Sequence, residues 1–600
     1  YSSAPPGPIP CRDIHIDTVN SVVQMIPSPC FWRKGRPDLR TGSLQLAPKD
    51  ARAGDPPVLM QMIEIRFARW EDISLNKART ASYSGGSQPA QGRERQMGPQ
   101  FAHHLHLGVR DRASHVRGEV QMTDAIATSQ GSSAMGRAPR LRPPRPAAPR
   151  PREAPQGQLG FLLGLWRNPL TTWTRRSFEQ SIVQSESLLG SVTVVSDPAA
   201  IRHVLVDNVA NYRKDALQLR ILRPGLGDGV FTAEGEDWRM QRRALAPLFT
   251  PRAVADFLPA MAQSAAWLEA RWRPLREGRR LDIAHEMSRV TLDVLERTIF
   301  PQGLTRDPAV FAQAMGTYFD AIGRLHPLDI IGAPDWAPRL GKRKPDESLR
   351  FFASAVDDIV MARKQWLEEQ AAEQPPPQDL LTRLLAARDP QTGEGLDEAS
   401  VRANVLTFIG AGHETTANGL TWSLYLLAFH PEWRAQVEEE VDEALKDGVT
   451  EAALARLIRT RATFEEALRL YPPAASLSRE AIGPDELAGR PIRAGSTVVI
   501  SPWVLHRHRK LWDRPDYFDP TRFMPGRREG IDRFAYLPFG AGPRICIGMG
   551  FAMQEAVILL ASIVKQARLD IAPGHRVEPV MRITLRPNGG MPMILRKRGD

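Results

Sequence analysis

One cysteine lies in a setting suited to metal chemistry. Cys546 follows the glycine-rich run Phe539-Gly540-Ala541-Gly542-Pro543-Arg544-Ile545, and no other cysteine occurs after Cys30. Glycines on both sides let the backbone close tightly around the sulfur. An apolar segment with helical spacing begins at Met549, so the thiol precedes a helix N-terminus, where free N–H groups favour the thiolate. This arrangement suits an axial ligand of a haem iron. The alternative is a free cysteine buried before a helix.

A second candidate pairs an acid with an alcohol inside a predicted helix over 396–430. Residues 410–416 read GAGHETT, and Asp397 can cap the helix start. Each glycine costs a helix interior about 1 kcal/mol relative to alanine, so something large must lie against it or the backbone must open. Glu414 and Thr415 could relay protons there. An ordinary helical Glu–Thr pair is the alternative. A zinc-protease helix would need a His at position 417, which is Ala.

Four motifs occur in one order between 238 and 548. They are W-x-x-x-R at 238–242, the acid–alcohol helix, E-x-x-R at 466–469 with P-x-R-F at 520–523, and F-x-x-G-x-R-x-C-x-G at 539–548. Together they make residues 161–600 resemble the cytochrome P-450 family. The resemblance implies a mainly α (α+β) P-450 fold and haem b bound through Cys546. It also implies monooxygenation, in which one atom of dioxygen enters an organic, hydrophobic substrate and the other becomes water.

The resemblance also implies roles for further residues. Thr415 and Glu414 become the catalytic proton relay. Glu466, Arg469 and Arg522 become a buried ionic triad, in which loss of one member would cost roughly 3–5 kcal/mol. The alternative for that helical acid–base pair is a surface contact of little value.

The two propionates of haem require cations near its edge. The resemblance assigns the cofactor to Trp238, Arg242, Arg479, Arg544, Phe539 and Gly548. His506 is a weaker candidate, because a lone histidine near a strand end is more often structural. Arg243 is expected to be solvated. Residues 225–229 (GLGDG) look like a phosphate loop, but no strand precedes them, so we expect a flexible loop that controls substrate access.

Electrons need another source. The sequence holds no flavin or nucleotide motif and no four-cysteine iron–sulfur motif, so a separate ferredoxin or flavoprotein is expected to supply them. The docking face would lie near Cys546. Four arginines could make it positive for an acidic partner: Arg527, Arg528, Arg533 and Arg544. A solvated loop at 527–528 is the alternative.

Two other functions stay open. One is a peroxide-driven peroxygenase or an isomerising haem-thiolate enzyme, although neither needs the dioxygen proton relay that Glu414 and Thr415 suggest. The other is a non-catalytic haem-binding gas sensor, which a test for product formation would separate from an enzyme.

The composition limits which cellular compartment and which binding partners we expect. The net charge is +11, but residues 1–160 hold 22 of the 79 Lys and Arg and only 13 of the 68 Asp and Glu. The rest is nearly neutral, which argues against nucleic acid. Three cysteines give no disulfide framework, and no window reaches the roughly 18–20 apolar residues of a membrane span. Without a convincing signal peptide, a cytoplasmic monomer is expected.

The elements that must position these residues begin late in the chain. Residues 1–121 lack periodicity, and we expect either translated upstream DNA before a start at Met122 or Met135, or a disordered extension. Residues 122–160 are expected to be a Pro/Arg-rich linker and 161–600 the haem domain. Helices are predicted at 199–206, 250–300, 308–325, 346–373 and 396–430, and strands at 191–195, 477–481, 493–500 and 582–595. Segments 212–236, 300–345 and 474–477 are expected to set substrate specificity.

Overall fold

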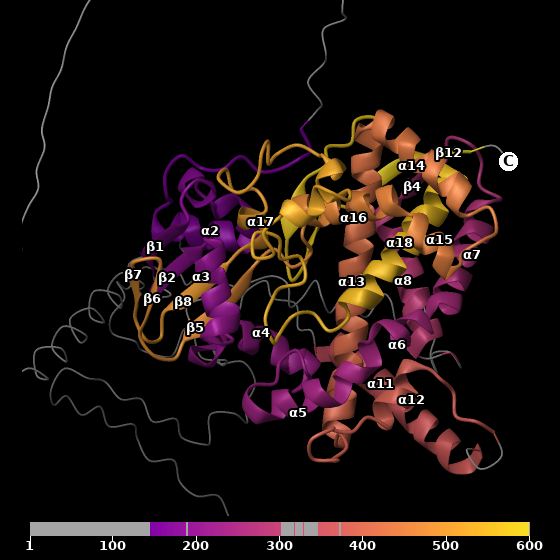
Figure 1. Ribbon diagram of the computed structural model, residues 1–600, viewed down its shortest axis with the longest axis horizontal. Helices are drawn as coiled ribbons and strands as arrows, with labels where there is room; N and C mark the ends of the chain where they lie inside the picture. The colour runs from indigo at the N-terminus through magenta and orange to yellow at the C-terminus, as the bar shows by residue number, and fades with distance from the viewer. Residues whose placement is uncertain are drawn as a thin grey trace, which may run out of the picture. The chain divides into compact units, whose positions relative to one another are not determined.

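The structure, a computed structural model, describes residues 145–187, 190–299, 346–370 and 374–598, with the single positions 301, 317 and 328 (Figure 1). All of them belong to the unit Ser132–Asp600. The expectations for residues 1–121, for a helix at 308–325 and for most of the specificity segment 300–345 lie outside the described residues.

A long helix, α13 (Glu398–Phe429), runs through the domain (Figure 1). Its start is capped as predicted, because the Asp397 side chain accepts a hydrogen bond from the backbone N–H of Ser400 at 2.7 Å. Helices α8 (Ile283–Ile299), α16 (Ile458–Leu470) and α18 (Met549–Gln566) pack against it. Most residues from 401 to 427 are therefore buried, which explains a helix that is apolar on nearly all sides.

The glycines of α13 have a packing role. A Cβ added at Gly412 would lie 3.0 Å from the Leu295 side chain of α8, so the missing side chain lets the two helices approach closely. The helix continues without interruption through residues 410–416. The sequence left two explanations for these glycines: a large group against the helix, or an opened helix backbone. The structure shows a neighbouring helix packed against Gly412 and no opening of the backbone.

The remaining helices surround this centre. Their bounds are α2 (Gln158–Arg167), α3 (Pro198–Arg202), α4 (Ala216–Leu226), α5 (Gly235–Leu245), α6 (Pro251–Ala255), α7 (Leu258–Trp272), α11 (Asp346–Gln370), α12 (Leu380–Leu385), α14 (Pro431–Ala444), α15 (Glu451–Arg456) and α17 (Pro502–Leu505). The helical region predicted at 250–300 contains three helices, α6, α7 and α8, and a turn at Gly278, with φ of 77°, and the short strand β4 separate α7 from α8. The flexible loop predicted at 225–229 is shorter, since α4 includes residues 225 and 226 and ends before Gly227.

The main sheet has five strands in the order β1 (Ile182–Ser187), β2 (Gly190–Val195), β8 (Thr497–Ile500), β5 (Leu477–Ala481), β3 (Tyr212–Arg213). Strands β2 and β8 are parallel, with Val194 opposite Val499, and the other neighbours are antiparallel. The strands predicted at 191–195 and 477–481 are confirmed. The strand predicted at 493–500 starts only at Thr497.

Three small sheets complete the β structure. One joins β4 (Arg280–Asp282), β12 (Pro592–Lys597) and β9 (Ala567–Ile571). The others are the pairs β6 (Asp485–Leu487) with β7 (Arg490–Ile492), and β10 (Pro579–Met581) with β11 (Leu585–Pro587). The strand predicted at 582–595 is therefore two strands, β11 and β12. This helix-rich architecture with small sheets is the mainly α, α+β fold that the sequence predicts.

The proline-rich residues 145–157 are bound to the domain. The backbone N–H of Ala147 donates to the Tyr425 hydroxyl at 3.0 Å, and the Tyr471 hydroxyl donates to the Ala147 carbonyl at 2.8 Å. Arg152 forms a β-bridge with Thr174. This part of the predicted linker is thus attached along its length, and the folded region begins before residue 161.

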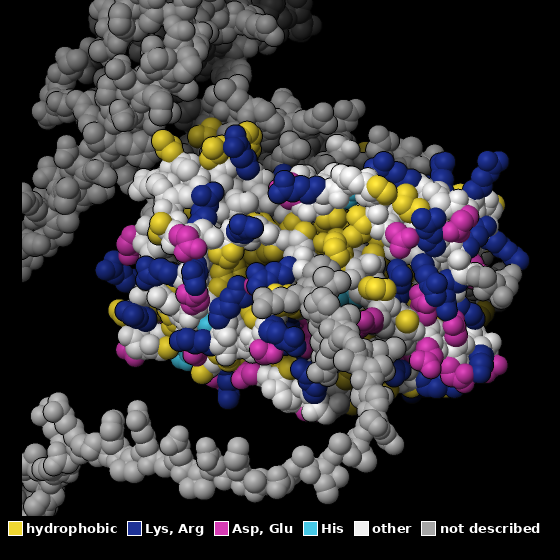
Figure 2. Space-filling view, turned by 90° about the horizontal axis from the view of Figure 1, so that it is seen from above, with side chains coloured by type: hydrophobic (Ala, Val, Ile, Leu, Met, Phe, Trp, Pro, Cys, Tyr) yellow, Lys and Arg dark blue, Asp and Glu magenta, His cyan; other side chains and the backbone are white. Residues whose placement is uncertain are grey.

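Charge is dispersed over the surface shown in Figure 2. Lys and Arg side chains alternate there with Asp and Glu, and hydrophobic side chains reach the surface between them. This mixture is what the near balance of charge beyond residue 160 predicts.

Candidate active site

The cysteine loop is closed by its own backbone. Gly540 and Gly542 have φ of 72° and 73°, and a Cβ at Gly542 would lie 1.9 Å from the Leu205 carbonyl oxygen, so only glycine fits there. The Cys546 N–H donates to the Phe539 carbonyl at 2.9 Å. Helix α18 begins three residues later, at Met549. The predicted position of the thiol before a helix is confirmed.

The electrostatics of the thiol differ from the prediction. Solvent reaches the Cys546 side chain, yet protein surrounds it on its other sides, and this burial raises the pKa of the thiol. The Gly548 backbone N–H and the Arg242 guanidinium lower that pKa, but by less. We expected the helix start to favour the thiolate form of the free side chain. That prediction is wrong, because burial raises the pKa of the thiol more than these contacts lower it. Coordination to a metal ion removes the thiol proton outright, and both contacts would then stabilise the ligand.

Four cations from separate elements influence one another behind this loop. Arg242 lies on α5, Arg479 on β5, Arg544 in the cysteine loop, and Lys214 directly after β3. Burial lowers the pKa of every one of them, that of Arg544 to about 10 and that of Lys214 to about 7. Repulsion from Arg544 and Arg479 lowers the pKa of Lys214 further, while Glu234 opposes it. Such a group of buried and half-buried like charges would be stabilised by an anion, and the two propionates of a haem have this chemistry.

Arg544 joins the cysteine loop to α5. Its guanidinium carbon lies 4.1 Å above the Trp238 ring, its Nη2 is 2.9 Å from Glu234 Oε1, and its Nη1 donates to the Ala233 carbonyl at 3.1 Å. Cation–π stacking and the ion pair fix both ends of the side chain. The structure thus brings Trp238, Arg242 and Arg544 together, as the family resemblance implies.

Lys214 was missed by the sequence reasoning. Its side chain is 7% exposed, its Nζ donates to the Phe231 carbonyl, and it lies 4.8 Å from the centre of the Phe231 ring. Nothing in the local sequence distinguishes it from a surface lysine before a helix. Its burial results from packing against β5 and the cysteine loop, which only the fold brings close.

The acid–alcohol pair lies midway along α13. The Thr415 hydroxyl donates to the Ala411 carbonyl at 2.6 Å, and Thr415 is half-buried. The Glu414 side chain is 13% exposed, and its Oε1 lies 3.7 Å from Nη1 of Arg586, which belongs to β11. The Thr415 oxygen therefore keeps its lone pairs for an acceptor role, and the Glu414 carboxyl group faces the Arg586 guanidinium. Arg586 is a partner that the sequence reasoning did not predict.

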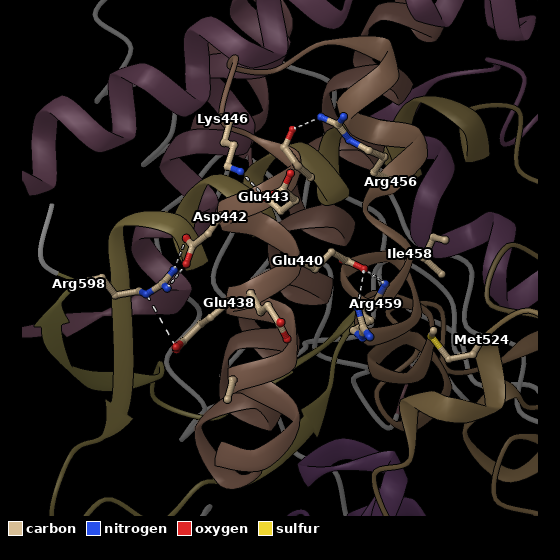
Figure 3. Close-up of a pocket in the computed structure, with 13 residues that line it drawn as sticks. Glu438, Glu440, Asp442, Glu443, Lys446, Arg456, Ile458, Arg459, Met524 and Arg598 are labelled. Atoms are coloured by element: carbon tan, nitrogen blue, oxygen red, sulfur yellow. Dashed lines mark hydrogen bonds and ion pairs between the residues drawn. The ribbon is translucent and has the colours of Figure 1, made fainter.

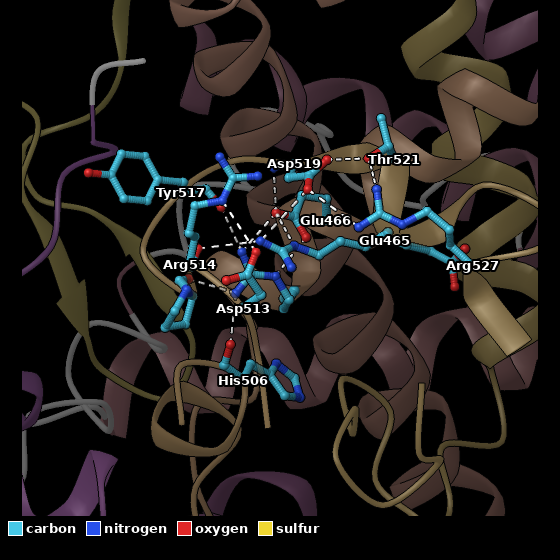
Figure 4. A network of polar contacts seen from close by, with 12 residues as sticks. Glu465, Glu466, His506, Asp513, Arg514, Tyr517, Asp519, Thr521 and Arg527 are labelled. Atoms are coloured by element: carbon cyan, nitrogen blue, oxygen red, sulfur yellow. Dashed lines mark hydrogen bonds and ion pairs between the residues drawn. The ribbon is translucent and has the colours of Figure 1, made fainter. Parts of the chain in front are cut away.

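The acid and base of α16 form a fully buried pair. Arg469 donates to the two Glu466 oxygens at 2.6 and 2.7 Å, and both side chains have an exposed fraction of 0%. Arg522 Nε lies 3.7 Å from Glu466 Oε1, and the Asp519 N–H donates to the same oxygen at 2.8 Å (Figure 4). The alternative of a surface ion pair is therefore wrong.

Arg469 has no donor to spare. It also donates to the carbonyls of His506, Pro515 and Tyr517 at 2.8, 2.8 and 2.9 Å (Figure 4). The pair thus ties α16 to the segment 506–519 that leads toward the cysteine loop.

Two weaker expectations have clear outcomes. His506 is buried and accepts the Leu537 N–H through Nε2 at 2.8 Å; burial first, then nearby arginines, lower its pKa to about 3. It is therefore a neutral structural residue. Arg243 was expected to be solvated, which is wrong: its Nη2 lies 2.6 Å from Asp389 Oδ2, and this contact lowers the pKa of Asp389 to about 2.

The predicted positive docking face is partly neutralised. Arg528 lies 3.0 Å from Glu465, Arg544 lies 2.9 Å from Glu234, and the more exposed Arg527 lies 3.8 Å from Asp519. Arg533 stacks over Phe534 at 4.9 Å. Acidic neighbours thus offset three of the four arginines.

A surface hollow of about 940 Å³ lies elsewhere, along α14 and α15 (Figure 3). Most of its charged side chains are paired with other side chains or with backbone groups. Asp442 lies 2.7 Å from Arg598, and Glu440 accepts the Arg459 and Thr460 N–H groups at 2.6 and 2.8 Å. None of the predicted site residues lines this hollow, so we do not assign it to the reaction.

A cysteine in a closed glycine loop, with buried and half-buried cations near it, indicates a haem-thiolate protein. The chain belongs to the cytochrome P450 family, since the family model described as Cytochrome P450 matches residues 165–592. Its cofactor is haem b, and it is an oxidoreductase that incorporates oxygen. Among the described residues no three His, Cys, Asp or Glu side chains gather as a metal site, and no helix there is long and apolar enough to cross a membrane.

Relatives span bacteria and plants. Cyclooctatin synthase of Streptomyces melanosporofaciens is 34% identical over 65% of this chain and 83% of its own. Protein LUTEIN DEFICIENT 5, chloroplastic, of Arabidopsis thaliana is 32% identical over 68% of this chain and 70% of its own. The crystal structure of the cytochrome P450DA heme domain superposes with a TM-score of 0.63 at 26% identity, over 76% of this chain and 98% of that one.

Proposed function

We propose that the chain is a monooxygenase that inserts one oxygen atom into a lipophilic organic substrate, with electrons from a separate redox partner. The observation that carries this proposal is the solvent-accessible Cys546 thiol in a loop closed by the Cys546–Phe539 hydrogen bond, beside one buried and three half-buried cations. Haem bound there supplies the activation of dioxygen.

The cofactor would be held from two sides. Cys546 would ligate the iron, with Phe539 and Gly548 shaping the loop around the sulfur. The propionates would meet five residues: Lys214, Trp238, Arg242, Arg479 and Arg544. The lowered pKa values of the four cations support this assignment, because burial lowers all four and a bound anion would offset that cost, together with the repulsion that also acts on Lys214 and Arg544.

Protons would reach the site through Glu414 and Thr415. The Thr415 hydroxyl already donates to the Ala411 carbonyl, so its oxygen can accept a further proton and release its own. Glu414, held near Arg586, would collect protons from solvent and pass them to Thr415. Glu466, Arg469 and Arg522 act at a distance, as positioning residues for the cysteine side.

The substrate class rests on relatives and on one aromatic side chain. Cyclooctat-9-en-7-ol 5-monooxygenase of Streptomyces melanosporofaciens is 32% identical to this chain, and a human ultra-long-chain fatty acid omega-hydroxylase is 31% identical. Both names denote hydrocarbon-rich substrates. Phe231, which is 41% exposed beside the Lys214 cation, would offer such a substrate an aromatic surface.

Replacement of the cysteine tests the haem-thiolate assignment. The reduced carbon monoxide complex of the wild type should show the strongly red-shifted Soret band of a thiolate ligand, and Cys546→Ser should lose it. Cys30→Ser is the matched control and should keep the band. Retention of the band by Cys546→Ser would refute the assignment.

Turnover tests the reaction and the electron source. The haem-loaded protein should form hydroxylated product from a lipophilic panel only when a ferredoxin or flavoprotein couple is supplied with reduced nicotinamide cofactor. Turnover with peroxide alone would instead favour the peroxygenase, and tight gas binding without product would favour the sensor. Product formed with the nicotinamide cofactor and no partner would refute the separate donor.

A further inference from the structure

The loop that joins α4 to α5 lies directly on the first half of α13. This loop, residues 227–234, is closed by its own backbone, because the N–H groups of Thr232 and Ala233 donate to the Gly229 carbonyl at 3.0 and 2.8 Å. A Cβ added at Gly229 would lie 2.8 Å from the Ala403 carbonyl oxygen of α13, so the missing side chain lets the loop come this close. The loop is therefore a compact unit packed against the helix.

Two buried amide side chains, Asn404 of α13 and Gln241 of α5, hold the 227–234 loop in place. Asn404 is 0% exposed and Gln241 is 2% exposed. Asn404 Oδ1 accepts the Val230 N–H at 2.9 Å, and its Nδ2 donates to Gln241 Oε1 at 2.8 Å. Gln241 Nε2 donates to the Asp228 carbonyl at 2.9 Å. In this amide pair each side chain uses both its oxygen and its nitrogen, and such a paired buried network makes the local structure rigid.

The other end of the loop meets two of the cations near the cysteine loop. The Phe231 carbonyl accepts a hydrogen bond from the Lys214 ammonium, and the Ala233 carbonyl accepts one from Arg544 Nη1 at 3.1 Å. Glu234 Oε1 lies 2.9 Å from Arg544 Nη2. The positions of both cations therefore depend on the loop, and the loop depends on the amide pair for two of its backbone contacts.

We propose that Asn404 and Gln241 are positioning residues for the carboxylates of the cofactor. They act through the 227–234 loop, which sets where Lys214 and Arg544 lie. The inference rests on the proposed function, because it takes these cations to hold the haem propionates. Without the amide pair, two backbone groups of the loop lose their partners, and the loop no longer fixes the two cations in one place. The strength of a charge-assisted hydrogen bond depends on distance and angle, so the propionates would then be held less firmly.

Haem dimethyl ester provides the test, because it keeps the porphyrin and the iron but lacks both free carboxylates. The full chain is loaded with haem b or with the ester, and the loss of each to an acceptor protein is timed. The ratio of the ester rate to the haem b rate measures how strongly the chain holds the carboxylates. A general loss of stability speeds both rates and leaves the ratio unchanged. In the wild type the ester should leave about ten times faster or more.

Two single variants and their combination test the amide pair. Asn404→Ala should lower the ratio about fivefold, as for the loss of one hydrogen bond, and Gln241→Ala should lower it by a similar factor. The double variant should lower it no further than either single variant, because the two side chains act as one unit.

Asn168 provides the matched control. It is 6% exposed, its Nδ2 donates to the Pro579 carbonyl at 3.0 Å, and its Oδ1 accepts the Met581 N–H at 3.2 Å. These bonds join the end of α2 to β10 and not to the 227–234 loop. Asn168→Ala should therefore leave the ratio unchanged, even if it speeds the loss of both haems.

The outcomes separate this inference from the proposed function. A wild-type ratio near one would refute the propionate site, and this inference with it. A high wild-type ratio that Asn404→Ala and Gln241→Ala both leave unchanged would overturn this inference alone. An equal fall of the ratio in Asn168→Ala would also overturn it, because the effect would not then depend on the loop.

Discussion

Glu466→Ala is the substitution with the largest expected effect on stability. The carboxylate accepts two hydrogen bonds from Arg469 at 2.6 and 2.7 Å and one from the Asp519 N–H, all in a place where its exposed fraction is 0%. Removing it leaves the Arg469 charge buried without a counterion. Breaking such a pair costs roughly 3–5 kcal/mol. Single domains are stable by only about 5–15 kcal/mol, so the variant should lose much of that margin.

The assay is the yield of soluble, haem-loaded protein together with its thermal midpoint. A loss of roughly 3–5 kcal/mol should lower the midpoint by about 3–5 °C in a domain of this size, because the unfolding entropy grows with chain length. Glu466→Gln should fall between the wild type and Glu466→Ala, because it keeps the shape but loses the charge. Arg469→Met should also be severe, because three carbonyls, those of His506, Pro515 and Tyr517, lose their donor.

A matched control comes from α5. Glu236 and Arg239 have the same residue types at the same spacing, 3.0 Å apart, but their side chains are 67% and 58% exposed. Glu236→Ala should leave the thermal midpoint unchanged, because solvent screens an exposed pair. If Glu466→Ala melts with the wild type and carries full haem, the reasoning from buried charge is refuted. The same follows if both glutamate variants melt at the same lower temperature.

Three further predictions concern the site and its supports. Thr415→Ala should keep haem but lower the ratio of product to consumed nicotinamide cofactor, because its hydroxyl no longer delivers protons. Lys214→Met should lose haem to an acceptor protein about ten times faster, since a charge-assisted hydrogen bond is gone. Because the Lys214 pKa is about 7 without an anion, wild-type haem retention should also weaken above pH 7, and less so in the variant. A chain starting at Met122 should match the full chain, whereas one starting at Gln158 should melt lower, because it lacks the hydrogen bonds of Ala147.

Each of these three predictions can be contradicted by one experimental result. An unchanged product ratio in Thr415→Ala would refute the relay. Haem loss at the wild-type rate in Lys214→Met would remove that lysine from the propionate site. A Gln158 start that melts with the full chain would show that the bound proline-rich segment adds no stability.

Much of the site could be predicted from the sequence, because its decisive features are local. The cysteine loop is fixed by Gly540 and Gly542, which take positive φ. It is also fixed by one backbone hydrogen bond within the loop, between Cys546 and Phe539. Glu466 and Arg469 are three residues apart on one helix, so their contact follows from helix geometry. The cap at Asp397 is also a short-range interaction.

The tertiary structure decided what those residues meet. Arg243 reaches Asp389, which is 146 residues away, and Glu414 lies near Arg586, so neither partner can be read from spacing. The pKa of Lys214 is lowered first by burial and then by the nearby charges of Arg544 and Arg479, which belong to the cysteine loop and β5. The Ala147 backbone forms hydrogen bonds with the hydroxyl groups of Tyr425 in α13 and Tyr471 at the end of α16. These contacts make this part of the predicted linker a part of the folded domain. Burial and electrostatic environment depend on distances between segments far apart in the chain, and the order of residues alone does not contain those distances.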